Sequence, residues 1–511
     1  MTESFRPINK WLITLTVMIP AFMEIVDTSI ANVALPHMKG SMNAGTEEIT
    51  WVLTSYLISN AIIMPMTGWL ARVFGRKRFL ISCIILFTFS SFLCGAAPNL
   101  AALVFFRIMQ GAAGGALIPM SQAIMLESFP PQEGGMALAI FGIGAMFGPV
   151  VGPTLGGWIT DNISWRWIFY INIPVGIIAV IMAKYFIFDP TYLKRHKAKI
   201  DYWGLSLLTL GIGSLQVVLD KGQQDDWFNS SFIITFSIIS VIALILFVFV
   251  ELKQEHPVVN LRLFKDTAFS TGNFIMFMVG FCLYGSVVML PLFLQTLMGY
   301  SATKAGLVMA PGGVASVIVM PIVGAYIKNH DGKKIIFGGL FLGAVSLFMM
   351  RGFNLEASYS DFVWPRVLLG AALGMIFPPL SRATLANISK VEMGNATGIF
   401  NLLRNIGGSV GIAISATLLA RLAQFYQANL VGHVNPFNPA LQSKFQGLKE
   451  AAIARGADAV TAHNMALEII SRIVRQEAGM MAYNYIFWIL GVSFLLILPL
   501  LLLFRRRRFG T

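Results

Sequence analysis

Two carboxylic acids, Glu24 and Asp27, stand inside a long apolar run near the start of the sequence, FMEIVDTSIANVALP. About twenty apolar residues span the hydrocarbon core of a bilayer, and an acid at the centre of such a helix costs about 3 kcal/mol. On an α-helix the two acids share a stripe about 140° wide with Thr28 and Asn32. A polar stripe at this depth must face protein or water, so we expect it to line a polar interior.

A buried carboxyl group in this position can exchange protons. Burial favours the neutral form of an acid, so a carboxyl group exposed alternately to two sides can couple proton movement to that of another molecule. Arg107, in the apolar segment FFRIMQGAAGG, is the expected partner, because an arginine in a membrane helix must pair or extend to the interface. We predict a proton-coupling site of Asp27, Glu24 and Arg107, with Glu24 nearer a vestibule. The alternative is a purely structural ion pair.

Membrane-spanning helices are the elements that must position these residues. The chain has 511 residues, of which 56% are hydrophobic and 12% are charged, whereas a soluble protein carries about 25% charged residues. The apolar blocks predict an all-α polytopic membrane protein, with the first block retained as a helix rather than cleaved as a signal peptide. We expect fourteen helices, near 12–35, 49–70, 78–97, 101–124, 136–159, 166–188, 201–220, 231–251, 268–294, 303–327, 334–350, 361–387, 396–421 and 482–504.

The positive charge of the chain follows the order of the loops. The net charge is +13, and its clusters RVFGRKR, KRHKAK, KNHDGKK and RRRR fall in even-numbered loops and at the C-terminus. Basic residues gather on the cytoplasmic side of membrane proteins. This pattern predicts that both termini are cytoplasmic, and it explains the charge without nucleic acid.

Residue types typical of catalysis or metal binding are scattered. The three cysteines fall inside apolar blocks, and the six histidines lie in loops without the spacing of metal ligands. Nucleotide-binding and nucleophile motifs are lacking in the sequence. We therefore expect no enzyme, no metal and no cofactor, with a proton gradient rather than ATP as the energy source. A membrane enzyme or sensor is the competing class, and a bound nucleotide or metal in purified protein would favour it.

An internal repeat divides the chain. The segment FRIMQGAAGGALIP (106–119) matches PRVLLGAALGMIFP (365–378) at an offset of 259, which the next helices keep. PMTGWL (65–70) matches PIVGAY (321–326) at an offset of 256. Two parallel six-helix repeats are the architecture of the major facilitator transporters. We predict an N-terminal half in 1–190, two inserted helices in 191–260 and a C-terminal half in 261–511.

The repeat shows which polar residues the fold can do without. The opening stretch matches FMVGFCLYGSVVMLP (277–291) at an offset of 255, so Glu24 corresponds to Val279 and Asp27 to Cys282. The second half builds the same helix without acids. We infer that the acids serve a function rather than the fold.

Further residues are candidates for substrate contact and for conformational change. Arg366, near a helix start, is expected to extend to the interface, whereas Arg404 is deeper. The predicted substrate cavity includes Asn32, Gln110, Asn401 and Arg404. Small residues and prolines allow close packing and bending, and they predict moving elements at Gly148, Pro149, Gly152, Pro153, Gly156 and Gly157 and, in the loop GWLARVFGRKR, at Gly68, Gly75, Arg76 and Lys77.

These motifs resemble those of a known family. VDTSIANVALP, RIMQG and GPVVGPTLGG are similar to motifs of the fourteen-helix drug/proton antiporters of the major facilitator superfamily, in particular the EmrB-type multidrug exporters. The segments WRWIFYINIPVG and NPFNPA are also typical of them. The resemblance implies proton-coupled export, with Asp27 at the acidic position and Arg107 and Gly111 in the coupling motif. One departure is Arg72, which stands where the family's loop motif has an acid, and it puts the charge latch between neighbouring helices in doubt.

Exporters of this kind work with a periplasmic membrane-fusion adaptor and an outer-membrane channel. The resemblance therefore implies a multi-pass protein of the inner membrane of a Gram-negative cell. The polar segment 422–480, outside by the predicted topology, would either dock the adaptor or form a lid over the cavity.

Export of bulky hydrophobic drugs and toxic compounds in exchange for protons is the leading functional prediction. The 40 Phe and 26 Met residues suit a deformable apolar pocket, although many such residues face lipid. The alternatives are export of one metabolite, such as a fatty acid or siderophore, and uptake rather than export.

Overall fold

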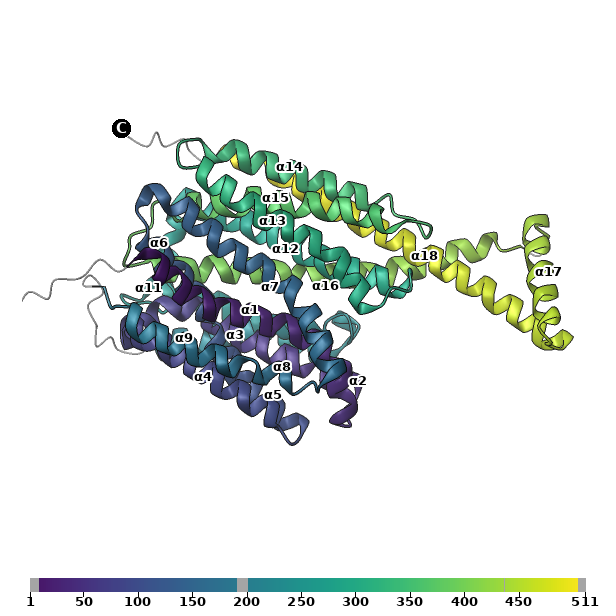
Figure 1. Ribbon diagram of the computed structural model, residues 1–511, viewed down its shortest axis with the longest axis horizontal. Coiled ribbons are helices and arrows are strands. Elements are labelled where there is room, and N and C mark those ends of the chain that lie inside the picture. The colour runs from purple at the N-terminus through teal and green to yellow at the C-terminus, as the bar shows by residue number, and fades with distance from the viewer. Residues whose placement is uncertain (1–8, 191–200, 436, 504–511) are drawn as a thin grey trace, which may run out of the picture.

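The computed structural model describes residues 9–190, 201–435 and 437–503, and every regular element within them is a helix (Figure 1). The basic clusters KRHKAK and RRRR lie outside the described residues. Thirteen helical segments in these ranges are long and apolar enough to cross a membrane. The helix α7 (Gly134–Asn162), 29 residues long, takes the fifth place in the order. With it, the described part contains the fourteen predicted spanning helices.

The N-terminal elements cover the first six predicted spans. The fourth span is divided in two because Pro119 has no N–H to donate to the carbonyl of Gly115, so the helix breaks at residues 115 and 116. The elements are α1 (Lys10–Ser41), α2 (Thr46–Ile49), α3 (Trp51–Phe74), α4 (Arg76–Ala96), α5 (Leu100–Gly114), α6 (Leu117–Ser128), α7, α8 (Trp167–Tyr170) and α9 (Asn172–Phe186).

The remaining elements form the inserted pair and the C-terminal half. The inserted helix α10 packs against α11, α3 and α16. It therefore contacts helices that come before and after it in the chain. The elements are α10 (Tyr202–Lys221), α11 (Ser231–Lys253), α12 (Thr267–Thr296), α13 (Ala302–Tyr326), α14 (Gly332–Met350), α15 (Tyr359–Leu385), α16 (Met393–His433), α17 (Pro439–Ala454) and α18 (Ala459–Ile497).

Corresponding helices of the repeat pack in the same way. The pairs α3–α5 and α1–α7 have counterparts in α13–α15 and α12–α16. A Cβ atom added to Gly111 would lie 2.4 Å from the Tyr56 carbonyl oxygen, and one added to Gly370 would lie 1.9 Å from that of Gly312. These residues correspond at the offsets of 259 and 256 found in the sequence. The domain boundaries drawn from the repeat remain a prediction.

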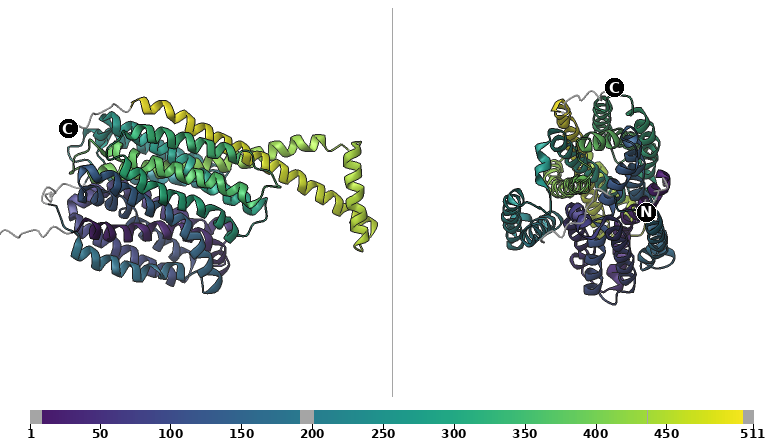
Figure 2. Two further views of the ribbon diagram at one scale, coloured as in Figure 1. Left: turned by 45° about the horizontal axis from the view of Figure 1, so that its top comes forward. Right: turned by 90° about the vertical axis from the view of Figure 1, so that its left-hand side faces the viewer.

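Two long helices project from the bundle. Helix α16 has 41 residues, a length of about 60 Å, twice the bilayer's hydrocarbon thickness of about 30 Å. Helix α18 continues in the same way, and α17 lies across the tip (Figures 1 and 2). Helix α16 thus continues past its expected membrane end near 421, and α18 begins well before its expected membrane start near 482. Their polar residues form helix in water as readily as apolar residues do in lipid. Helix α1 begins and α18 ends at the opposite end of the bundle (Figure 1).

The close approach at Gly111 gives a test of this packing. Replacing Gly111 by Ala places a methyl group against the backbone of α3, and such overpacking costs about 1–3 kcal/mol. We expect Gly111→Ala to lower the thermal unfolding temperature of the purified protein. Unfolding is measured as the loss of the monodisperse peak in size-exclusion chromatography after heating. Gly213→Ala is the matched control, because its Cβ would meet only side chains of Ile58 and Ile62 at 3.6 Å. Equal unfolding temperatures for the two variants would contradict the packing.

Candidate functional site

Asp27 lies at the centre of a buried polar cluster between α1, α3, α5 and α9. The residue is 1% exposed. Its Oδ2 accepts a hydrogen bond of 2.7 Å from Nη1 of Arg107, and its Oδ1 accepts bonds from Gln110 (2.9 Å) and Asn172 (2.7 Å). All three partners are donors, so this surrounding is built for an ionised carboxylate.

Arg107 supplies the opposite charge and is fully enclosed. Its guanidinium carbon lies 4.1 Å from the centre of the Tyr56 ring, and its Nε donates to the carbonyl of Val52 at 3.1 Å. Nη1 also donates to Oε1 of Gln110 at 2.8 Å. Two charges removed from water hold each other strongly, and removing one partner of such a pair costs about 3–5 kcal/mol.

Glu24 lies one turn of α1 closer to the end where that helix begins, and its surroundings differ. Its Oε1 accepts hydrogen bonds from the Tyr56 hydroxyl (3.2 Å) and from Nδ2 of Asn60 (2.9 Å). Its Oε2 is buried without a hydrogen-bond partner among the described residues. Arg404 of α16 is close enough for its charge to act on Glu24. Because no cation in ranges 9–190, 201–435 and 437–503 bonds Glu24 directly, a neutral carboxyl group fits here better than it fits at Asp27.

Sequence reasoning found the charges of this cluster and missed three neutral members. Tyr56 and Asn60 lie four residues apart on one face of α3, and Asn172 is the first residue of α9. The polar run SYLISN within an apolar block, and the asparagine in WRWIFYINIPVG, were the available signals. Gly114 allows the approach, because a Cβ there would lie 2.9 Å from the Tyr56 hydroxyl.

The residues predicted to line a substrate cavity occupy different surroundings. Gln110 belongs to the Asp27 cluster, and Asn401 is buried where its Nδ2 donates to Oε1 of Gln122 at 2.6 Å. Asn32 is exposed and donates to the carbonyl of Thr28 in its own helix. Arg404 is buried near Glu24. Their roles toward a substrate stay predictions.

The two halves meet closely at the end of the bundle where α1 begins. A Cβ added to Gly68, near the end of α3, would lie 2.3 Å from the backbone nitrogen of Asn395 in α16. One added to Gly135, at the start of α7, would lie 2.6 Å from Ile327, just after α13. By the predicted topology this is the cytoplasmic end. The structure is closed there.

An ion pair joins the halves at this closed end. Nη1 of Arg72 donates to Oε1 of Glu392 at 3.0 Å, and Asn395 donates to the other carboxylate oxygen at 2.9 Å. Arg76 makes two bonds of 2.5 and 2.7 Å to Glu127 within its own half. The basic residue at position 72, which put the charge latch in doubt, thus contacts an acid that the other half supplies.

The other predicted moving elements lie next to the acids or at the loop. Gly148, Gly152 and Gly156 of α7 face α1, where an added Cβ would lie 2.4 or 2.5 Å from side chains of Ile25, Ser29 and Ile30. Gly157 is free of such contact. Nothing is described of the side chains of Pro149 and Pro153. Gly75 ends α3 with φ of 86°, a conformation that favours glycine, and the backbone N–H of Lys77 donates to Asp189.

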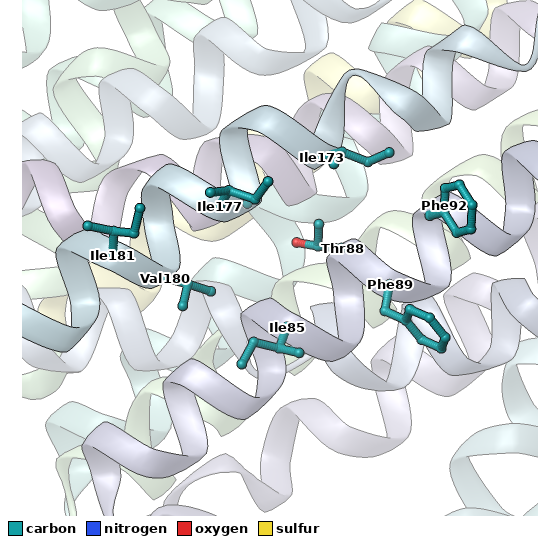
Figure 3. Close-up of a pocket in the computed structure, with 9 residues that line it drawn as sticks. Ile85, Thr88, Phe89, Phe92, Ile173, Ile177, Val180 and Ile181 are labelled. Carbon is teal, nitrogen blue, oxygen red and sulfur yellow. The ribbon is translucent and has the colours of Figure 1, made fainter.

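An apolar groove lies between α4 and α9, away from the polar cluster (Figure 3). Its volume is about 420 Å³. Phe89 and Ile177, on its rim, are largely exposed. The groove suits an acyl chain of the surrounding membrane, and its lining residues hold no charged group.

Comparisons with known proteins agree on one family. The profile of the Major Facilitator Superfamily matches residues 17–412. The chain is 37% identical to the multidrug export protein EmrB of Haemophilus influenzae, over 100% of this chain and 99% of the relative. It is 36% identical to the fatty acid resistance protein FarB of Neisseria gonorrhoeae, over 96% and 94%. The crystal structure of the human organic anion transporter MFSD10 superposes with a TM-score of 0.64 at 13% identity, covering 96% of this chain and 99% of that one.

The Arg72–Glu392 pair predicts how the closed end responds to charge. Arg72→Glu or Glu392→Arg places like charges together, and a change of about 1 kcal/mol alters an equilibrium about fivefold. We expect each variant to increase labelling of an Ala71→Cys reporter by an impermeant maleimide in inside-out vesicles, by about that factor. Ala71 is buried at the closed end.

The double exchange Arg72→Glu/Glu392→Arg should return labelling to the original rate. Arg78→Glu, an exposed residue of α4, is the control for charge alone. Equal labelling in all variants would show that the pair does not hold this end closed.

Proposed function

The chain belongs to the major facilitator superfamily, among the exporters of the EmrB type, and on this premise we propose that it exports drugs and other amphipathic compounds in exchange for protons. It is a transporter rather than an enzyme, and a multi-pass protein of the inner membrane. Export of a single class of metabolite is the second candidate. The name of the fatty acid resistance protein FarB, 36% identical, favours a fatty acid for that role.

The buried Asp27–Arg107 pair carries the proposal of proton coupling. It lies between four helices, and three donors hold the carboxylate. The repeat builds the corresponding site with Cys282 in place of Asp27. A costly charge pair that one half of the fold does without is best explained by a function that needs a titrating group.

The geometry suggests how a proton would act. In the state described, Asp27 is paired and the end predicted to be cytoplasmic is closed. A proton bound to Asp27 removes its negative charge and weakens its hold on Arg107, so that the contacts of α1 with α5 and α9 loosen. Glu24 is the accessory acid, positioned three residues away on α1 and close to Arg404 of the other half. Substrate and proton would then favour opposite states of the bundle.

The driving force is adequate for export. One proton that moves down a membrane potential of about 100 mV supplies about 2.3 kcal/mol. Because each 1.4 kcal/mol corresponds to about a tenfold ratio, one proton per uncharged molecule supports a gradient of about fiftyfold.

The projection of α16, α17 and α18 is the proposed docking element for a periplasmic adaptor, which would lead to an outer-membrane channel. Helix α17 packs on α18 and lies beyond the outer ends of the other helices (Figure 2). This position favours docking over a lid across the bundle. The projection carries large apolar side chains that are more than two thirds exposed, among them Phe437 before α17 and Val460 in α18. With both termini in the cytoplasm, the projection would reach into the periplasm.

The coupling role of Asp27 is tested in proteoliposomes. Wild-type protein should move protons across the membrane when a lipophilic cation such as ethidium is added. A pH indicator trapped inside the liposomes measures this proton flux. Asp27→Asn keeps the shape of the side chain but cannot carry a proton. We expect it to bind ethidium and to lose the drug-linked proton flux at least tenfold.

Glu24→Gln is the matched variant on the same helix and should keep measurable coupling. Normal coupling in Asp27→Asn together with loss in Glu24→Gln would move the role to Glu24. Normal coupling in both variants would make the cluster structural. A wild-type protein without drug-linked flux would contradict drug/proton exchange itself.

A further inference from the structure

Arg366 of α15 is a buried cation with two nitrogens that lack a hydrogen-bond partner in the described part of the chain. The residue is 7% exposed, and its Nε and Nη1 are buried without a hydrogen-bond partner among the described residues. The sequence predicted that it extends to the interface, but a side chain that did so would expose these nitrogens. A buried charged donor without a partner is costly, so the site calls for a group that the chain itself does not supply.

Comparison with the N-terminal half shows which hydrogen bonds Arg366 lacks. Arg366 corresponds to Arg107 at the offset of 259, and the matching contacts of Gly111 and Gly370 show that the two arginines stand at equivalent places in their halves. In the N-terminal half the Nε and Nη1 of Arg107 are both bonded. The same two nitrogens are the unbonded ones in Arg366.

Three side chains that contact Arg107 have smaller or apolar counterparts at the matching positions of the second half. Cys282 replaces Asp27, Leu369 replaces Gln110, and Gly312 replaces Tyr56 at the offsets of 255, 259 and 256. The carboxylate that balances the charge is therefore absent from this set. The aromatic ring that covers Arg107 is absent too, since glycine stands at position 312.

The backbone that carries Arg366 is held in place. Ser346 donates to the carbonyl of Pro365 at 2.6 Å, and Gly312 lies against the carbonyl of Arg366 itself. Packing therefore fixes the backbone at Arg366, whereas no described residue bonds the Nε and Nη1 of its guanidinium. In the other half Nη1 of Arg107 donates to Asp27 while its Nε donates to a backbone carbonyl, so Nη1 of Arg366 is the charged donor that a carboxylate oxygen would accept from.

We propose that Arg366 binds the carboxylate of an amphipathic substrate, in the place that Asp27 fills beside Arg107 in the other half. This inference rests on the proposed export function and adds to it a second charged site, separate from the one that carries the proton. The acyl or aromatic body of such a substrate would lie along the apolar helices, while its head group replaces the missing internal acid.

The test uses amphiphiles that differ only in the head group. Full-length protein in phosphatidylcholine nanodiscs is given dodecanoate, dodecanol or dodecyltrimethylammonium, and dissociation constants are measured by displacement of radiolabelled dodecanoate or ethidium. We expect wild type to bind dodecanoate at least about tenfold more tightly than dodecanol, the ratio expected of hydrogen bonds to a charged group. Arg366→Gln should remove this preference without changing the affinity for the cation.

Cys282→Asp is the second variant and places a carboxylate where the repeat has Asp27. It should occupy Arg366 and abolish the preference for dodecanoate, whereas Cys282→Asn should keep it. Arg351→Gln, at an exposed arginine at the end of α14, is the control for loss of positive charge.

The possible outcomes separate this inference from the function on which it rests. If wild type exports ethidium but shows no preference for dodecanoate, or if folded Arg366→Gln and Cys282→Asp keep that preference, the carboxylate site is wrong and export stands. If phosphatidylglycerol in the nanodisc removes the preference of wild type, the anion held is a lipid head group, and the substrate assignment is overturned. If wild type reconstituted in proteoliposomes transports none of these compounds, the proposed export fails and this inference fails with it.

Discussion

An opposite charge stabilises a charge buried in a membrane protein, and the N-terminal half contains one such buried pair, Asp27 and Arg107. The hydrogen bond between them is 2.7 Å long and closed to water. Breaking the pair without replacing either charge would cost several kcal/mol. The helices that carry it, α1 and α5, are thus held together as long as Asp27 is ionised. A single proton is enough to change that condition, which makes the pair suited to coupling.

The packing around the pair shows how a local change can reach the rest of the bundle. Gly148, Gly152 and Gly156 place α7 directly on the turns of α1 that follow Glu24, and α7 in turn packs against α13 and α15 of the other half. Arg72 and Glu392 add a charged contact at the closed end. A shift of α1 would therefore displace α7, because the glycine contacts between the two helices are too close to absorb the movement. The two halves share a fold but differ in charge, since Arg366 lacks the acid that Arg107 has.

The sequence predicted the features that depend on pattern along one chain. The apolar blocks predicted the fourteen helices, the nearly constant offsets predicted the repeat, and the cost of charge in lipid singled out Glu24, Asp27 and Arg107. Features that depend on contacts between distant segments were not predictable in this way. Tyr56 and Asn172 carry no charge to single them out in the sequence, and only the folded arrangement brings them to the acids. Glu392, the partner of Arg72, is 320 positions away in the sequence. The residues around Arg72 therefore gave no indication of this ion pair.

Infrared difference spectroscopy tests most directly whether Asp27 is the group that exchanges the proton. A protonated carboxyl group has a carbonyl stretch that an ionised one lacks, so the spectrum of oriented protein films can be recorded before and after addition of a transported compound. For films prepared at a pH at which Asp27 carries its proton, the account predicts that the compound removes a protonated-carboxyl band in wild type, that Glu24→Gln retains this change, and that Asp27→Asn lacks it. A band that persists in Asp27→Asn and disappears in Glu24→Gln would contradict the assignment of the proton to Asp27.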